Sequence, residues 1–253
     1  MLLVRPDHNG PDAVALAAHG ITPVIEPFLD VTPIDDPGVA EQLADALSQL
    51  DRDDWVALTS ARTLPAWRAL DQRVDDVLVC ALSRGVKLAA VGPTTAQTLT
   101  PATVPALIGD GSGARALLAQ LLTAAQGQPR AALLPGSDLA SRTLPEGLRS
   151  AGWSVTAIAA YRIAPVTATP AASAALRTGQ IDAVLLRSPS AVRAVAGHSV
   201  LAPGTVVFGV GESTAHTARQ KGWSVHALHP ADPQAIAVEV AYHLHNDQWS
   251  RKT

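Results

Sequence analysis

Short apolar runs alternate with stretches of helical period along nearly the whole chain. The runs are apolar at consecutive rather than alternate positions, which predicts strands that are covered on both faces of a sheet. Helical stretches such as residues 38–50, 114–125 and 191–197 separate them, an order typical of parallel sheets with crossover helices. The sequence therefore predicts an α/β fold. The predicted strands are residues 2–4, 23–27, 55–58, 87–91, 131–134, 155–160, 183–186, 206–210 and 225–228.

Three short motifs occur twice in the chain. In the first motif a predicted helix ends at a glycine, which favours the left-handed backbone of a helix C-cap, and a strand follows. A chain that carries each unit twice predicts two similar domains that arose by duplication. The pairs are residues 151–155 (AGWSV) with 221–225 (KGWSV) and, as a weaker copy, 19–24 (HGITPV), residues 91–96 (VGPTTA) with 210–215 (VGESTA), and residues 58–61 (LTSA) with 186–189 (LRSP).

Two stretches rich in Thr, Val and Pro, residues 30–33 and 164–170, are predicted to be extended linkers. If they lie side by side, the chain leaves the first domain near residue 30 and re-enters it near residue 170. The first domain is then discontinuous, with residues 1–30 and 171–253, and the second comprises residues 31–170 with both linkers. Composition alone leaves a simple split near residue 127 open as an alternative.

Composition and charge narrow the class of protein. With 253 residues, 47% of them apolar, the chain is too long for one small core and too apolar to be disordered. Its 19 basic and 22 acidic residues argue against a nucleic-acid groove. No run reaches the roughly 20 apolar residues of a membrane helix, and the first apolar run is too short for a signal peptide. We therefore expect a soluble, cytoplasmic protein.

The single cysteine, Cys80, excludes a disulfide framework and a structural zinc site. Its apolar neighbours predict that it is buried by packing. The sequence also lacks the glycine fingerprint of dinucleotide sites, the phosphate loop of nucleotide hydrolases and the HExxH zinc motif. These absences disfavour a nucleotide-using transferase.

Hydroxyl-rich segments are predicted where strands end and helices begin. In open parallel sheets ligands bind at these carboxyl ends of the strands. Hydroxyl groups and free backbone N–H groups there can form anion sites. The alternative is that these segments are ordinary helix N-caps, which also favour Ser, Thr and Asp. The segments are residues 59–60, 92–95, 135–138, 188–190 and 211–214.

Taken in order, the motifs of this chain resemble the uroporphyrinogen-III synthase family, and the resemblance covers almost the full chain. The fold of that family is two α/β domains joined by a two-stranded ladder, so the resemblance implies the discontinuous topology that the two linkers suggest. The motifs are residues 3–6 (LVRP), 55–60 (WVALTS), 91–96 (VGPTTA), 133–136 (LLPG), 152–162, 188–192 (SPSAV), 211–215 (GESTA) and 233–235 (PQA).

The resemblance implies a lyase that cyclises hydroxymethylbilane to uroporphyrinogen III in the cleft between the domains. Water is lost, and the last pyrrole ring is inverted through a spiro-pyrrolenine intermediate. The resemblance implies no cofactor and no metal. It also implies a monomer that binds this substrate and product, with transient contact to the preceding pathway enzyme and none to nucleic acid or membranes. Helix N-termini would supply donors to the substrate carboxylates.

Tyr161 matches the family tyrosine that is proposed to assist departure of the substrate hydroxyl, since a phenol can donate that hydrogen bond at neutral pH. The alternative is an interface tyrosine at the mouth of the linker. The remaining candidates are expected to bind substrate. They are Arg5, Thr59, Ser60, Ala61, Gly92, Thr94, Thr95, Ser137, Ser188, Ser190, Gly211, Ser213 and Thr214.

Three positions depart from the family pattern. Glu212 stands where Pro or Ala is usual and places a negative charge beside an expected carboxylate site. Gly136 stands where Arg is frequent. Arg187 stands where Thr is common and would restore a positive charge. Two α/β domains with a cleft also describe a non-catalytic small-molecule sensor or a tetrapyrrole-binding module, which stays open as the alternative function.

Overall fold

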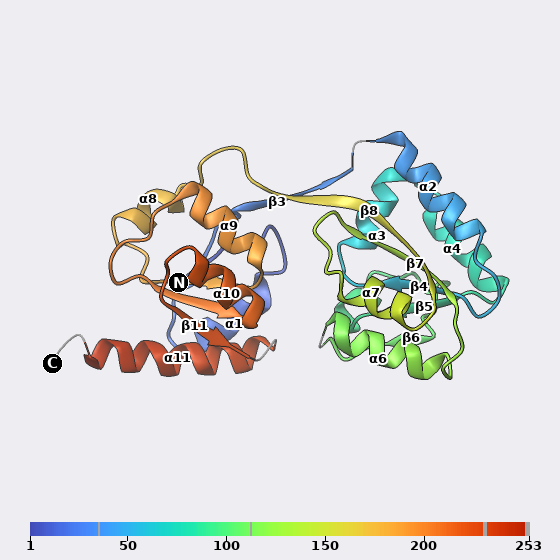
Figure 1. Ribbon diagram of the computed structural model, residues 1–253. Helices are drawn as coiled ribbons and strands as arrows, with labels where there is room; N and C mark the ends of the chain where they lie inside the picture. Colours follow the sequence, from blue (N-terminus) through green and yellow to red (C-terminus); the bar gives the residue numbers. More distant parts are fainter. Residues whose placement is uncertain (35, 112, 230–231, 251–253) are drawn as a thin grey trace. The chain divides into compact units, whose positions relative to one another are not determined.

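The computed structural model describes residues 1–34, 36–111, 113–229 and 232–250 and shows alternating strands and helices (Figure 1). The strands are β1 (Leu2–Leu3), β2 (Val24–Ile25), β3 (Leu29–Pro33), β4 (Trp55–Leu58), β5 (Lys87–Ala90), β6 (Leu107–Ile108), β7 (Ala131–Ser137), β8 (Ser154–Pro165), β9 (Ala183–Leu186), β10 (Val206–Val210) and β11 (Val225–Leu228). The helices are α1 (Gly10–Ala18), α2 (Pro37–Ser48), α3 (Thr63–Leu70), α4 (Val74–Ser83), α5 (Pro93–Ala96), α6 (Ala114–Ala124), α7 (Thr143–Ser150), α8 (Ala172–Arg177), α9 (Pro189–His198), α10 (Glu212–Gln220) and α11 (Pro233–Ser250).

The described strands form two sheets in two compact units. Unit 1 consists of Met1–Val31 and Ala164–Thr253, and unit 2 of Thr32–Ile163. One sheet has the strand order β11-β10-β9-β1-β2, and the other has the order β3-β8-β7-β4-β5-β6. Strand pairing is parallel from β11 to β2 and from β8 to β6. The predicted α/β class with parallel sheets is therefore confirmed.

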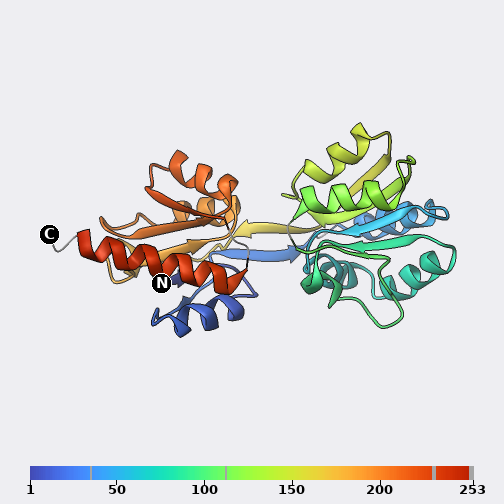
Figure 2. The same cartoon turned by 90° about the horizontal axis from the view of Figure 1, so that it is seen from below.

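The chain crosses from one unit to the other twice, along β3 and β8, which are neighbours in the sheet. The N–H of Val166 donates to the carbonyl of Phe28, and the N–H of Ile34 donates to the carbonyl of Ala160. Residue numbers rise along one strand as they fall along the other, so the two strands are antiparallel, as their arrowheads show in Figure 2.

The two compact units of the structure divide between Ile163 and Ala164, inside β8. The reason is that β8 continues without a break from the sheet into the ladder, whereas residues 166–170 follow the end of that strand. Thr, Val and Pro favour extended backbone but do not indicate which extended residues are paired. The assignment of residues 1–30 with 171–253 and of residues 31–170 to separate domains stays a prediction.

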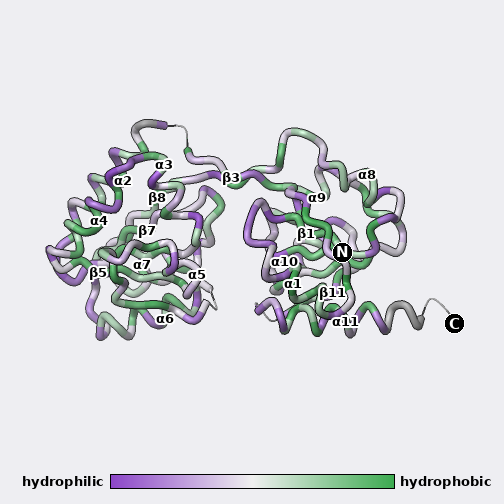
Figure 3. The backbone as a smooth tube through the Cα atoms, turned by 180° about the vertical axis from the view of Figure 1, so that it is seen from behind, coloured by the Kyte–Doolittle hydropathy of each residue, from purple (hydrophilic) through white to green (hydrophobic). Residues whose placement is uncertain are grey.

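Apolar side chains from the strands and helices form a core within each unit. Figure 3 colours the backbone by hydropathy, and hydrophobic stretches run along the strands. In unit 2, one face of the sheet packs against Leu117 and Leu121 of α6 and Leu144 and Leu148 of α7. In unit 1, one sheet face packs against Leu16 of α1 and against α11. Burial of the central strands explains why their residues are apolar at every position rather than at alternate ones.

Glycines end three helices in the conformation that the first repeat predicted. Gly20, Gly152 and Gly222 have φ angles of +75°, +84° and +79°. The N–H of Trp153 then donates to the carbonyl of Leu148, five residues earlier, as in a Schellman cap. The same hydrogen bond recurs after Gly20 and Gly222, so the prediction of left-handed caps is confirmed.

Two expectations from the sequence differ from the structure. Cys80 is exposed on α4, because its apolar neighbours Val74, Leu78 and Ala81 form the buried face of that helix and Cys80 does not. Residues 107–108, which carry no strand pattern, form β6 at the edge of the unit 2 sheet. Among the described helices, none combines the length and the apolarity that crossing a membrane requires.

Candidate active site

A pocket of about 280 Å³ opens in unit 2 where β4 and β7 end, beside the middle of β8. This is the edge of a parallel sheet at which ligands usually bind. Four of the residues predicted from the sequence line it together: Thr59 and Ser60 after β4, Ser137 at the end of β7, and Tyr161 on β8. Apart from Ser141, residues without polar side chains, such as Leu134 and Ala157, form the rest of the wall. The pocket therefore combines apolar walls with a few hydroxyl groups, as small-molecule sites do.

The position of Tyr161 depends on an irregularity between β7 and β8. Gly136 pairs with Ala159, but the next residue, Ser137, pairs with Tyr161, so the register skips Ala160. A bulge of this kind re-aims a side chain at the end of a strand. With regular pairing Ala160 would stand opposite Ser137; the shift puts Tyr161 there instead. Only 2% of Tyr161 is exposed, and no described residue forms a hydrogen bond with its hydroxyl.

The serines of the pocket also shape their own loops. The N–H of Arg62 donates to Ser60 Oγ over 3.2 Å, and the N–H of Leu139 donates to Ser137 Oγ over 2.9 Å. These are side-chain turns, in which a hydroxyl oxygen replaces a backbone acceptor. Each hydroxyl retains a proton that it can donate to a ligand. The N-caps of α3 and α7 are Arg62 and Arg142, so the N-cap interpretation is wrong for Ser60 and Ser137. Their role in the turns is compatible with the predicted binding role.

A neighbouring pocket of about 380 Å³ contains charged residues that the sequence reasoning missed. It shares the wall formed by Gly136, Ser137 and Ala140 but also reaches Arg142 and Glu146 at the start of α7. The polar run after β7, residues 137–142, is the signal that could have found them.

Asp138 fastens the loop after β7 to β8. Its carboxylate accepts a hydrogen bond from the N–H of Ile163 over 3.2 Å and forms an ion pair with Arg162 over 3.4 Å. Its own N–H donates to the carbonyl of Tyr161. These contacts hold β8 from Tyr161 to Ile163 against the loop after β7.

The predicted residues around α5 are not part of the pocket lining. Gly92 is closely packed, and a Cβ atom there would lie 2.8 Å from Cα of Gly111, so this approach of two backbone segments requires glycine. Thr95 is buried, whereas Thr94 is exposed, and Ala61 is partly buried beside the pocket residue Ser60. These residues thus do not line the pocket, although their neighbours Ser60 and Val91 do.

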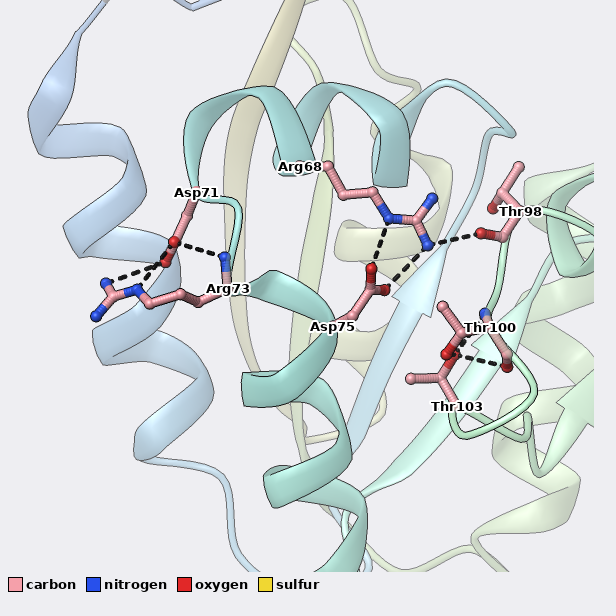
Figure 4. A network of polar contacts seen from close by, with 7 residues as sticks. All are labelled: Arg68, Asp71, Arg73, Asp75, Thr98, Thr100 and Thr103. Carbon is pink, nitrogen blue, oxygen red and sulfur yellow. Dashed lines mark hydrogen bonds and ion pairs between the residues drawn. The ribbon is translucent and has the colours of Figure 1, made fainter.

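A polar network fixes the segment after α5 to α3 and α4 (Figure 4). The Arg68 guanidinium donates two hydrogen bonds to the Asp75 carboxylate, over 2.8 and 2.9 Å, and a third to the carbonyl of Thr98 over 3.0 Å. Thr98 Oγ1 in turn donates to the carbonyl of Thr95 over 2.7 Å. In the same figure Arg73 donates to Asp71, and this side-chain hydrogen bond lowers the pKa of the Asp71 carboxyl.

The predicted residues of unit 1 lie at the carboxyl edge of its sheet. Ser188 is the N-cap of α9 and accepts a hydrogen bond from the N–H of Ala191, and its hydroxyl lies 2.9 Å from that of Ser190. Gly211 precedes α10 with a φ of +79°. Ser213 is exposed and Thr214 is buried. Strand-end hydroxyls thus occur in both units, as the repeats predicted.

Arg5, which was expected to bind substrate, and Arg187, which was expected to restore a positive charge, bind a carboxylate of the protein itself. Asp12 accepts hydrogen bonds from Arg5 over 2.9 Å and from Arg187 over 2.8 Å. Glu212, the negative charge expected to disturb a binding loop, forms an ion pair with Arg219 over 2.6 Å. Among the described residues, no group of three or more His, Cys, Asp or Glu side chains is placed to hold a metal ion.

A family model described as uroporphyrinogen-III synthase HemD matches residues 12–235 of the chain. The chain belongs to the uroporphyrinogen-III synthase family. The resemblance drawn from the order of the sequence motifs is thereby confirmed. The match spans both units and includes Tyr161, Asp12 and the strand-end hydroxyls of the repeats.

Solved structures of uroporphyrinogen-III synthases share this fold. A mutant uroporphyrinogen III synthase from the extremely thermophilic bacterium Thermus thermophilus is 18% identical, with 94% of each chain covered and a TM-score of 0.58. Uroporphyrinogen-III synthetase from Helicobacter pylori is 14% identical, with 96% of this chain and 98% of that chain covered and a TM-score of 0.61. Comparison with curated proteins finds no significant match.

Proposed function

We propose that this protein is a uroporphyrinogen-III synthase that cyclises hydroxymethylbilane to uroporphyrinogen III. The observation that carries the proposal is the family match over residues 12–235, nearly the whole chain. The unit 2 pocket supports it, because hydroxyl groups and apolar walls suit a pyrrole ring with carboxylate side chains. As the reaction breaks a carbon–oxygen bond and releases water, the enzyme is a lyase.

The reaction begins when the hydroxymethyl group loses its hydroxyl as water, after that oxygen receives a proton. The pyrrole nitrogen supplies the electron pair that forms the electrophilic azafulvene. The substituted carbon of the last ring attacks it and gives a spiro-pyrrolenine, which fragments and recloses with that ring inverted. Loss of a ring proton restores the pyrrole, so the only net change is the loss of one water molecule. The protein's task is to fold the substrate and to stabilise the leaving hydroxyl.

In this mechanism Tyr161 donates a hydrogen bond to the departing hydroxyl. Its side chain is 2% exposed and lines a pocket in which Thr59, Ser60 and Ser137 are the other hydroxyl residues named from the sequence. A phenol hydroxyl can donate a hydrogen bond to an oxygen that leaves. Burial strengthens the hydrogen bond because there is little competing water.

The size of the pocket limits how much of the substrate it holds. Its volume of about 280 Å³ lies just below the usual range for sites that enclose a whole ligand, about 300–1,000 Å³. A linear tetrapyrrole with eight carboxylates is larger than a typical drug, so we assign the pocket to one ring with its two side chains. Ser60 and Ser137 then donate to the carboxylates of that ring. The other rings must be bound by other residues.

We extend the proposal to a monomeric cytoplasmic enzyme that contacts the enzyme supplying hydroxymethylbilane only transiently. The reaction is unimolecular, so it needs no second chain to supply a co-substrate. Light scattering after size-exclusion chromatography, at micromolar concentration, measures the mass of each eluted protein. This protein should have the mass of a single chain both alone and after mixing with the supplying enzyme. A stable dimer or complex would contradict this part of the proposal.

Isomer analysis of the product tests the function itself. The protein is mixed with freshly generated hydroxymethylbilane, the product is oxidised, and the type I and type III porphyrins are separated. Hydroxymethylbilane cyclises spontaneously to the type I isomer, so a sample without protein is the control. We expect type III to exceed type I. Only type I, from a folded protein that binds porphyrin, would overturn the enzyme function in favour of a tetrapyrrole-binding module.

A further inference from the structure

The larger pocket of unit 2 adjoins the pocket that Tyr161 lines. We call the pocket with Tyr161 the hydroxyl pocket and its neighbour, which reaches Arg142 and Glu146, the charged pocket. Residues such as Gly136 and Ala157 line both, so the two pockets share a wall. The charged pocket has a volume of about 380 Å³ and so lies within the usual range for small-molecule sites, about 300–1,000 Å³.

Small residues form the floor of the charged pocket. Ala157 and Ala159 are two residues apart on β8, so their side chains lie on the same face of the sheet. Ala157 is exposed, although the faces of a parallel sheet are usually covered. A Cβ atom added to Gly136 would contact only the Cβ atom of Ala140, at 3.6 Å. Larger side chains at these positions would fill the pocket, so its space depends on their small size.

Four charged side chains line the charged pocket, and two of them are already bound within the protein. The Asp138 carboxylate is held by β8, and the Arg149 guanidinium donates to the carbonyl of Val155 over 2.9 Å. The side chains of Arg142 and Glu146 form no hydrogen bond or ion pair with any residue that the structure describes. Both are exposed and therefore open to a ligand.

Arg142 and Glu146 present opposite charges to one ligand. The N–H of Glu146 donates to the carbonyl of Arg142 over 2.9 Å, so the two residues lie one helical turn apart on the same side of α7. Glu146 would repel a ligand that is only anionic, and Arg142 one that is only cationic. A pyrrole ring with acidic side chains suits both, because its N–H can donate to a carboxylate while its own carboxylates accept from a guanidinium.

The cyclisation requires the first and the last ring of the substrate to lie next to each other. In the proposed mechanism Tyr161 acts on the ring that loses its hydroxyl, which places that ring in the hydroxyl pocket. A bond then forms between the substituted carbon of the last ring and the methylene carbon of the azafulvene. The electron pair comes from the last ring, so the positive charge passes to its nitrogen. The adjoining pocket can hold the last ring within reach of this bond.

We propose that the charged pocket binds the last pyrrole ring, the ring that is inverted, and that Glu146 is a catalytic residue. Its carboxylate accepts a hydrogen bond from the N–H of that ring and stabilises the positive charge that the nitrogen gains in the spiro intermediate. Arg142 binds an acidic side chain of the same ring. The inference rests on the proposed function, which supplies the substrate and the ring inversion.

The isomer ratio of the product tests this assignment. A last ring that is not held in place attacks the azafulvene through its unsubstituted carbon, which gives type I product without inversion. The wild-type protein is compared with Glu146→Gln, Glu146→Asp and Ala159→Leu. Glu146→Gln and Ala159→Leu should raise the ratio of type I to type III about tenfold, the worth of one charge-assisted hydrogen bond. Glu146→Asp should recover part of the wild-type ratio, because it keeps the carboxylate.

Type I product must form faster than in a sample without protein, and in proportion to the protein concentration. A merely damaged protein would leave only the spontaneous rate. Glu41→Gln is the matched control, since Glu41 is an exposed glutamate of α2 in the same unit that lines neither pocket. It should keep the wild-type ratio. Thermal unfolding checks that each variant is folded, and the two Glu146 variants decide if Ala159→Leu is not.

The outcomes separate this inference from the proposed function. If the wild-type protein makes type III product and Glu146→Gln keeps its isomer ratio, the binding of the last ring in the charged pocket is refuted and the enzyme function stands. A lower rate at an unchanged ratio refutes it as well. If the wild-type protein itself makes no type III product, the enzyme function fails, and the assignment of the last ring fails with it.

Discussion

The carboxyl edges of the two sheets differ in charge although repeated motifs end their strands. Residue 59 in unit 2 and residue 187 in unit 1 occupy the same place in the repeat, but one is Thr and the other Arg. Thr59 lines a pocket without charged side chains, whereas Arg187 forms an ion pair with the buried Asp12. The repeat thus determines where a loop leaves the sheet, and a single side chain determines which chemistry the loop can perform.

The glycines of the second repeat differ in the same way. Gly92 has extended backbone but lies against the backbone of Gly111, so that a Cβ atom on Gly92 would be only 2.8 Å from the Gly111 Cα. Gly211 has nothing within 4 Å of such a Cβ atom but adopts a φ of +79° and a ψ of 150°, a region that only glycine enters readily. The same residue type at equivalent positions is required by packing in unit 2 and by backbone conformation in unit 1.

The largest effect is expected at Tyr161, which has no counterpart among the repeated motifs. Tyr161→Phe should lower kcat by roughly 10²–10⁴-fold, because the leaving hydroxyl loses its proton donor. The melting temperature should hardly change, since the ring that packs against the pocket wall is retained. Turnover at saturating hydroxymethylbilane measures the loss, with Tyr242→Phe, a change at a 65% exposed tyrosine of α11, as the control. Full activity of Tyr161→Phe would reduce Tyr161 to a structural role.

Substitutions of Gly92 and Gly211 should distinguish steric overlap with a neighbouring segment from strain in the glycine's own backbone. Gly92→Ala and Gly211→Ala are each expected to lower the free energy of unfolding by about 1–3 kcal/mol. Gly92→Ser should cost more than Gly92→Ala, because its additional atom increases the overlap with Gly111. Gly211→Ser should cost the same as Gly211→Ala, because the space there is open. Urea unfolding of the four variants measures these differences, and an equal increment at both positions would contradict the comparison.

Ser60 and Ser188 occupy equivalent places in the third repeat. Their hydroxyls should contribute differently to the stability of the protein but similarly to ligand binding. Ser188→Ala removes the N-cap of α9 and should lower the free energy of unfolding by about 1 kcal/mol. Ser60→Ala removes only a turn hydrogen bond and should cost less. Each change should weaken binding of uroporphyrin III by about tenfold or less, the worth of one hydrogen bond. Calorimetric titration decides this, and loss of all binding from one substitution would point to a single dominant anchor.

The smallest effect is expected at Glu212, which is charged where the other copy of the second repeat has the neutral Pro93. Its ion pair with Arg219 is exposed, and exposed pairs contribute about 0–1 kcal/mol. Glu212→Gln should therefore change neither the melting temperature nor Kd for uroporphyrin III by a measurable amount. A clear gain in affinity would show that the Glu212 charge does repel a substrate carboxylate.

The strands and the helix ends of this protein were predictable because they depend on local patterns. β4, β9, β10 and β11 have the bounds that continuous apolarity predicted. Of these, β4, β9 and β10 are inner strands of a parallel sheet, which is covered on both faces. The glycines at 20, 152 and 222 adopt positive φ as the repeats indicated. Failures occurred where the pattern was weak: β6 has only two residues, and the apolar neighbours of Cys80 did not reveal which face of α4 is buried.

The candidate site was predictable in its residue types but not in its contacts. Hydroxyls at strand ends followed from the sequence, and Thr59, Ser60, Ser137 and Tyr161 do meet in one pocket. The sequence did not show that Arg142 and Glu146 line the neighbouring pocket, because helix N-termini are commonly polar for capping alone. Nor did it show that Gly92 is a packing residue, which depends on its contact with Gly111 in a separate loop.

The sequence by itself determined the parallel α/β architecture, the duplicated motifs, the glycine caps and membership of the family, because periodicity, turn chemistry and motif order are properties of consecutive residues. Only the tertiary structure decided that a bulge skips Ala160 and sets Tyr161 opposite Ser137, and that Asp12 accepts from both Arg5 and Arg187, the latter 175 residues away. The physical reason is that register and charge pairing depend on which distant segments the fold brings together, and a charge is stable in a buried position only when its partners lie beside it.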